Sequence, residues 1–198
     1  MIKPINECII NKKTSNKPVW FMRQAGRYLP EFRDIRKKNP NFINLCLNKN
    51  LVPEITLQPI KRFKSLDAAI IFSDILIVPF ALGQNINFDE KKGPILSKLD
   101  IENFKKLKEN KFLTILKPVY NTLEQTRKKL DKNKALIGFV GAPWTLAVYM
   151  LGLKNDNILN TELLKKKETD IKFIIEKITE YLCLHIEKQV NAGANVIQ

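Results

Sequence analysis

Asp67-Ala68-Ala69-Ile70-Ile71-Phe72 is a nearly unbroken apolar run, and Ser73-Asp74 follow it directly. A continuous run of this kind, rather than an alternation of apolar and polar residues, is typical of a strand buried on both faces in a parallel sheet. Similar runs occur on either side of it along the chain. Together they predict four parallel strands near residues 18–22, 67–73, 135–140 and 194–198.

Helical patterns fill the intervals between these runs. Apolar residues at helix spacing predict helices over 53–64, 118–130 and 169–189, and turn residues predict a β-hairpin over 83–93. Alternation of strands and helices indicates an α/β fold, either a barrel or an open doubly wound sheet. Four strands do not close an eight-stranded barrel, so we interpret residues 1–198 as one domain that forms about the first half of a (β/α)8 TIM barrel.

Composition narrows the class of protein. The chain has 198 residues, 44% of them hydrophobic, and carries 34 Lys and Arg against 20 Asp and Glu, a formal net charge of +14. This composition argues against disorder. No apolar run approaches a membrane span, and the first residues lack the apolar core of a secretory signal. The three cysteines form no CxxC pair, which indicates neither disulfides nor zinc. We therefore expect a soluble, reduced, cytoplasmic protein.

Two arginines separated by three residues follow the first predicted strand. Arg23 and Arg27 would lie at the carboxyl end of that strand, where barrels place their active sites, and guanidinium groups bind carboxylate or phosphate in bidentate fashion. Gly26 between them would permit tight backbone geometry. The alternative is a pair of ordinary surface arginines, which is also our interpretation of Arg33 and Arg36.

Asp74 is the second candidate. A carboxylate between apolar neighbours is costly to bury unless it is paired or functional, although a helix N-cap at Ser73 or Asp74 is an alternative. Tyr149 is the third candidate, because it follows the glycine-containing stretch that begins at Gly138; a core position is its alternative. His185, the only histidine, is expected to pack within the protein rather than bind metal.

Three stretches of the sequence resemble the characteristic blocks of the uroporphyrinogen decarboxylase family. They are Trp20–Arg33, Ala69–Pro79 and Gly138–Tyr149, in the family's order, with Gly93-Pro94 between the last two. The resemblance covers nearly the entire chain. It implies a (β/α)8 barrel that works in the cytoplasm, as a homodimer at full length, without metal or organic cofactor. The reaction implied is removal of CO2 from the four acetate side chains of uroporphyrinogen III in heme biosynthesis, giving coproporphyrinogen III.

The resemblance also implies roles for individual residues. Asp74, Arg23 and Tyr149 match the catalytic positions of the family, with Asp74 facing the pyrrole N–H groups. The residues matching its substrate-binding positions are Arg23, Gln24, Ala25, Gly26, Arg27, Asp74 and Tyr149. The sequence departs from the family shortly after Tyr149: the chain reads Met150-Leu151-Gly152-Leu153-Lys154-Asn155 instead of a Glu-Gly pair and a Gly/Ser-rich turn.

The resemblance places a hydroxyl residue and a histidine of the pocket beyond Gln198. The 198-residue chain alone is therefore expected to show little activity, as an inactive remnant or as half of a split enzyme with a complementary C-terminal fragment. Two other functions are alternatives. One is a corrinoid- or thiol-dependent methyltransferase on the same barrel, which would carry zinc ligands; the other is a basic anion- or nucleic-acid-binding protein, suggested only by the charge.

Overall fold

The computed structural model describes residues 3–12, 17–22, 24–89, 93–155, 158–166 and 168–198. The chain divides into two compact units. The first contains Met1–Asp74, Lys117–Phe139 and Ile186–Gln198, and the second contains Ile75–Leu116 and Val140–His185. None of the helices within the described ranges is both long enough and apolar enough to cross a membrane. The assignment of all 198 residues to one barrel domain stays a prediction.

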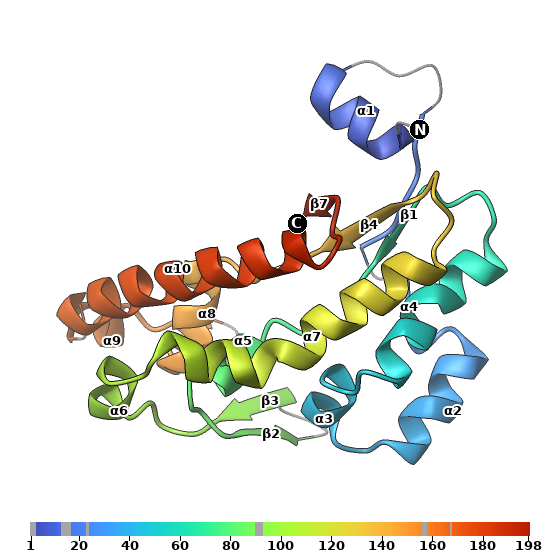
Figure 1. Cartoon of the computed structure of the whole chain (residues 1–198). Helices are drawn as coiled ribbons and strands as arrows, with labels where there is room; N and C mark the ends of the chain where they lie inside the picture. The colour runs from blue at the N-terminus through green and yellow to red at the C-terminus, as the bar shows by residue number, and fades with distance from the viewer. Residues whose placement is uncertain (1–2, 13–16, 23, 90–92, 156–157, 167) are drawn as a thin grey trace. The chain divides into compact units, whose positions relative to one another are not determined.

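A three-stranded parallel sheet forms the centre of the first unit (Figure 1). Strand β4 (Ala135–Gly138) lies between β1 (Ala68–Ile70) and β7 (Val196–Ile197), with Ala68 opposite Ala135. Backbone hydrogen bonds continue past the strand ends, for example from Ile71 N–H to the Ile137 carbonyl over 2.9 Å. The α/β class and three of the four predicted parallel strands are therefore confirmed.

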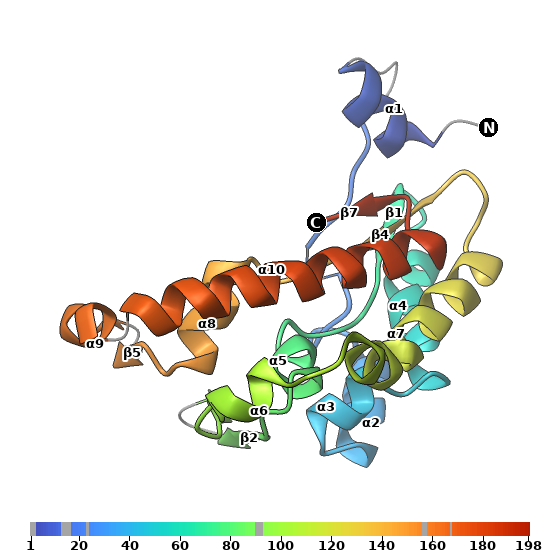
Figure 2. The same ribbon diagram turned by 60° about the vertical axis from the view of Figure 1, so that its left-hand side comes forward.

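Helices α1 (Pro4–Asn11), α2 (Pro30–Lys38), α3 (Phe42–Cys46) and α4 (Leu51–Arg62) belong to the first unit, and α2 and α3 both contact α4 (Figure 2). Helices α7 (Glu109–Lys129) and α10 (Glu168–Asn191) both begin in the second unit and end in the first. The helices predicted over 53–64, 118–130 and 169–189 correspond to α4, the second half of α7, and α10. Their types are confirmed, with shifted boundaries.

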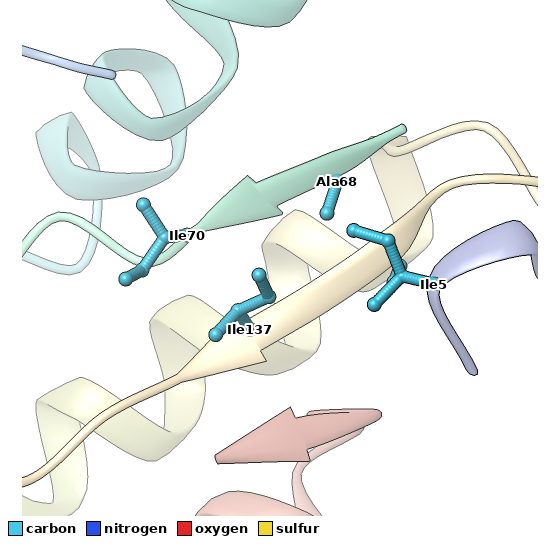
Figure 3. Packing of buried hydrophobic residues seen from close by; sticks show 5 residues of the cluster. Ile5, Ala68, Ile70 and Ile137 are labelled. Atoms are coloured by element: carbon cyan, nitrogen blue, oxygen red, sulfur yellow. The ribbon is translucent and has the colours of Figure 1, made fainter. Parts of the chain in front are cut away.

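Helix α1 is anchored to the sheet by Ile5. Its side chain packs with Ala68, Ile70, Ala135 and Ile137, and Figure 3 shows it pointing towards the sheet beside Ala68 and Ile137. Ala68 and Ala135 are partners in the pairing of β1 with β4, and their short methyl side chains leave room for a larger side chain to pack over this face of the sheet. Ile5 is buried there, with 5% of its surface exposed. The small residues of β1 and β4 therefore help to determine where helix α1 packs.

The second unit is mainly helical, with two short hairpins. Strands β2 (Ile86–Asp89) and β3 (Gly93–Leu96) pair antiparallel, which confirms the type of the hairpin predicted over 83–93 and shifts its bounds towards the carboxyl terminus. A smaller hairpin joins β5 (Lys154–Asn155) and β6 (Ile158–Leu159). The helices of this unit, besides its parts of α7 and α10, are α5 (Ile77–Ala81), α6 (Ile101–Lys105), α8 (Pro143–Met150) and α9 (Thr161–Lys166).

The prediction of a strand over 18–22 is wrong. These residues are described but have no strand conformation. The reason lies in how they bind the sheet: Asp67 N–H donates to the Val19 carbonyl, whereas Val19 N–H donates to the Asp67 carboxylate over 2.8 Å. Pro18 has no N–H to offer. A side chain therefore takes one of the places that a ladder of backbone bonds would need.

Candidate functional site

The arginine loop, residues 24–29, connects the segment beside β1 to helix α2. Arg23 lies outside the described residues. Arg27 is exposed, and no hydrogen bond or ion pair involves its guanidinium within the described part of the chain. Leu29 N–H donates to the Gly26 carbonyl over 3.0 Å, which closes the loop into a turn before α2 begins. Arg27 is thus presented to solvent with its donors free to bind an anion.

Gly26 does not have the role that its residue type suggested. Its φ is not positive, and a Cβ built there would meet only Tyr28 Cδ1 at 3.9 Å, an ordinary contact. The backbone of the loop therefore does not require glycine, and the expectation of a tight geometry at this position is wrong. Tyr28 instead folds back over the loop, where its hydroxyl donates to the Gln24 carbonyl.

Arg33 also holds the loop, although the sequence indicated only an ordinary surface residue. Its Nη1 donates to the carbonyl of Arg27 over 2.9 Å and to that of Tyr28 over 3.3 Å. Arg33 lies on the exposed side of α2, and no pattern in the sequence distinguishes such a residue from a solvated cation. Its two contacts restrain the backbone on which Arg27 is carried.

The backbone after β1 is held by helix α4 and by an aromatic cluster. Phe72 N–H donates to Thr56 Oγ1 over 3.0 Å. The Phe72 ring lies 5.3 Å from that of Phe32, and the same apolar cluster includes Ala25 and Leu29 of the arginine loop. The loop and the segment that leads to Asp74 therefore pack on one core. The sequence did not reveal this connection.

Asp74 is half-buried and close to the thiol of Cys46. Burial, and then the negative charge of Asp74, raise the pKa of that thiol above its ordinary range. The alternative of an N-cap is wrong, because the next helix, α5, begins at Ile77 with Leu76 as its N-cap. Asp74 therefore does not cap that helix.

Tyr149 belongs to the second unit, on α8. Pro143 occupies the first turn of this helix, where its missing N–H costs nothing. Tyr149 is 36% exposed, so the core alternative is wrong. The end of α8 is held by Gln84, whose Nε2 donates to the carbonyls of Met150 (3.0 Å) and Ser97 (2.7 Å). The catalytic and substrate-binding roles that the resemblance implies for Tyr149 stay a prediction.

His185 is a core residue, as expected. It is 1% exposed, its ring lies edge-on to that of Phe112 at 6.3 Å, and burial lowers its pKa to about 4. The described ranges contain no group of three or more His, Cys, Asp or Glu residues that could hold a metal ion.

Similarity to solved structures concerns the fold. A methyltransferase from Methanosarcina mazei superposes with a TM-score of 0.74 and 18% sequence identity, over 98% of this chain and 56% of the methyltransferase. Because the identity is so low, the superposition shows a shared fold and nothing about activity.

Similarity of sequence identifies the family. Proteins called uroporphyrinogen decarboxylase from Campylobacter jejuni and Helicobacter pylori are 44% and 43% identical to the chain, each over 98% of its length. One from Agrobacterium fabrum is 42% identical over 96% of the chain. The chain spans 56–58% of the length of these relatives. The sequence model of the family "Uroporphyrinogen decarboxylase (URO-D)" matches residues 3–198. The chain therefore belongs to the uroporphyrinogen decarboxylase family.

Proposed function

We propose that the chain binds uroporphyrinogen III and supplies part of the site that decarboxylates its four acetate side chains to give coproporphyrinogen III. One observation carries the proposal. The arginine loop and the segment leading to Asp74 pack on one apolar cluster beside β1, in a chain whose residues 3–198 match this family. A cationic loop and a carboxylate carried by segments of one packed core would suit a ligand with carboxylates at its rim and N–H groups at its centre.

The chemistry explains why an aspartate would be needed. A proton adds to a pyrrole ring carbon and leaves a cationic ring. The bond between the acetate methylene and its carboxylate then breaks, CO2 leaves, and the bonding electrons neutralise the ring. A proton taken up at the methylene and one lost from the ring complete the methyl group, so each acetate consumes one proton net. Asp74 would accept hydrogen bonds from the pyrrole N–H groups and stabilise the cation.

The arginines would orient the substrate. Uroporphyrinogen III carries eight carboxylates, and we propose that Arg23 and Arg27 hold some of them in bidentate hydrogen bonds while the backbone of Gln24, Ala25 and Gly26 forms the adjoining wall. Arg23 would also assist proton delivery. The net charge of +14 would attract such a polyanion from a distance.

Tyr149 would complete this part of the pocket as a hydrogen-bonding group. Its exposure supports the proposal, since a side chain in the core could not contact substrate. We further propose a homodimer, a complementary C-terminal segment and a cytoplasmic location, all by analogy with the family, and a reaction that needs no metal or organic cofactor.

Turnover tests the proposal. The chain is incubated anaerobically with uroporphyrinogen III, alone and with the C-terminal remainder of the Campylobacter jejuni relative, and the oxidised products are separated. We expect coproporphyrinogen chiefly with the added segment, and a loss of at least about 100-fold in Asp74→Asn. Asp34→Asn on exposed α2 is the matched control and should leave the rate unchanged. Equal activity of the two variants would contradict the role of Asp74.

A further inference from the structure

We infer that the side chain of Gln24 is a positioning residue that sets the arginine loop on strand β1, so that its effect on substrate binding passes through Arg27. The inference rests on the proposed function and adds a residue role to it. Gln24 lies within the arginine loop, yet it is only 3% exposed. A side chain so buried acts on its protein neighbours rather than on a bound ligand.

Both ends of the Gln24 amide are used. Its Oε1 accepts from Phe21 N–H over 2.9 Å, and its Nε2 donates to the Ala68 carbonyl over 3.0 Å. The first bond ties the amide to the segment before the loop, and the second ties it to β1. One side chain therefore joins the segment that precedes the loop to the neighbouring strand.

The Ala68 carbonyl faces an edge that β4 does not use. Ile71 N–H bonds to β4, and because alternate residues of a strand direct their backbone groups to opposite edges, the groups of Ala68 face the other edge. There the Gln24 amide takes the place of a neighbouring strand's N–H. This explains how residues 18–22 lie beside β1 without forming a strand, and why the loop has a fixed start.

Other hydrogen bonds also restrain the loop, and they act together with the bond from Gln24 to Ala68. The Tyr28 hydroxyl donates to the Gln24 backbone carbonyl, and Arg33 holds the carbonyls of Arg27 and Tyr28. These bonds fix the loop relative to itself and to α2, whereas the Gln24 amide fixes it relative to β1 and so to the strand that leads to Asp74. Without this bond, Arg27 would keep its charge but lose its placement.

Gln24→Met tests the inference, because methionine has a similar volume and no amide. The matched control is Gln58→Met, since Gln58 is a 5% exposed glutamine whose amide has no hydrogen-bond partner within the described residues. The probe is uroporphyrin III, an air-stable ligand with the same eight carboxylates, followed by fluorescence. We expect Gln24→Met to weaken binding by about tenfold and Gln58→Met to leave it unchanged.

A double-mutant cycle separates positioning from general loss of stability. In the Arg27→Gln background, Gln24→Met should weaken binding less than about twofold, because the group that it positions is already gone. An equal loss in both backgrounds would overturn the inference. Gln24→Glu should bind weakly at neutral pH and recover as the pH falls, since a protonated glutamate can again donate to Ala68 while accepting from Phe21.

Amide hydrogen exchange tests the inference even if the proposed function fails. If the wild-type chain does not bind uroporphyrin, the substrate proposal fails, but Phe21 N–H should still exchange at least about tenfold faster in Gln24→Met than in wild type or Gln58→Met. Unchanged exchange at Phe21 would overturn the placement role itself.

Discussion

Thr56 and Phe72 are joined by a hydrogen bond between helix α4 and the end of strand β1. Thr56 Oγ1 accepts from Phe72 N–H over 3.0 Å and donates to the Val52 carbonyl over 2.7 Å. Thr56 is 1% exposed, so water does not compete for these bonds. Because Phe72 is two residues before Asp74, helix α4 helps to set the course of the chain as it approaches the candidate carboxylate.

Thr56→Val should therefore destabilise the chain by about 1–3 kcal/mol, because the Phe72 N–H loses its acceptor. Thr114→Val is the matched control: Thr114 Oγ1 also donates to the carbonyl four residues earlier, over 2.7 Å, but it lies on an exposed face. Its effect should stay within about 0.5 kcal/mol. Urea unfolding of both variants provides the measurement, and equal effects would show that the bond to Phe72 contributes nothing.

Apolar runs and helix periodicity predicted the elements that a sequence can reveal locally. The strands near Ala68, Ala135 and Val196, the hairpin and the helix over 169–189 were all predicted correctly in type. The segment at residues 18–22 has the same apolar character, yet its backbone bonds to side chains: Val19 N–H donates to the Asp67 carboxylate, and Phe21 N–H donates to Gln24 Oε1. The same Gln24 amide donates to the distant Ala68 carbonyl. Contacts of this range leave no periodic signal, so the sequence could not exclude a strand there.

Gln58→Met should stabilise the chain. Both amide atoms of Gln58 are buried without a hydrogen-bond partner among the described residues, and an unpaired buried amide costs about 1–3 kcal/mol. Methionine would fill the same space without that penalty. We expect the free energy of unfolding, measured by urea denaturation, to rise by about 1 kcal/mol. A loss of stability would mean that the amide has a partner that the geometry does not reveal.

Replacement by alanine should lower the free energy of unfolding at Gly138 but leave it nearly unchanged at Gly26. A Cβ at Gly138 would lie 2.4 Å from Gln189 Oε1, and that amide pairs with both the N–H and the carbonyl of Phe139 over 3.1 Å. Gly138→Ala should therefore cost about 1–3 kcal/mol by displacing Gln189. Gly26→Ala should stay within about 0.5 kcal/mol.

The same pair of glycines separates stability from binding. If the backbone of the arginine loop adjoins the substrate, Gly26→Ala should weaken uroporphyrin binding although the fold is unaffected.

The contact at Gly138 is checked in the Gln189→Ala background, where Gly138→Ala should lower the free energy of unfolding clearly less than in wild type. An undiminished cost would assign the strain to another neighbour, such as Ile197.

Because of His185, the free energy of unfolding should fall as the solution becomes acidic. Burial lowers its pKa to about 4 from an ordinary 6.5, so the unfolded chain binds the proton more readily than the folded chain. The stabilisation is complete above about pH 6.5 and declines as the pH falls towards 4, by up to about 3 kcal/mol. His185→Gln should flatten the dependence in this window, measured by urea unfolding at several pH values. A slope identical to that of wild type would contradict the assignment.

Residue type and position along the chain were enough to select the candidate residues of the site, but not the residues that hold them in place. Asp74 follows an apolar run and Tyr149 follows another, and these positions selected them. The residues that hold the site have no such signature: Thr56 and Gln24 act through single bonds to distant backbone, and Arg33 resembles any exposed cation. Such supports are found from geometry rather than from pattern.

Binding of uroporphyrinogen III itself tests the central claim most directly. Anaerobic titration of the 198-residue chain, followed by quenching of Trp20 and Trp144 fluorescence, compares wild type with Asp74→Asn and Arg27→Gln, with Asp34→Asn and Lys37→Gln as matched controls. We predict at least about tenfold weaker binding for the first two variants and no change for the controls. Binding that falls equally for Arg27→Gln and Lys37→Gln, and is unchanged in Asp74→Asn, would reduce the interaction to net charge and contradict the assignment of this site.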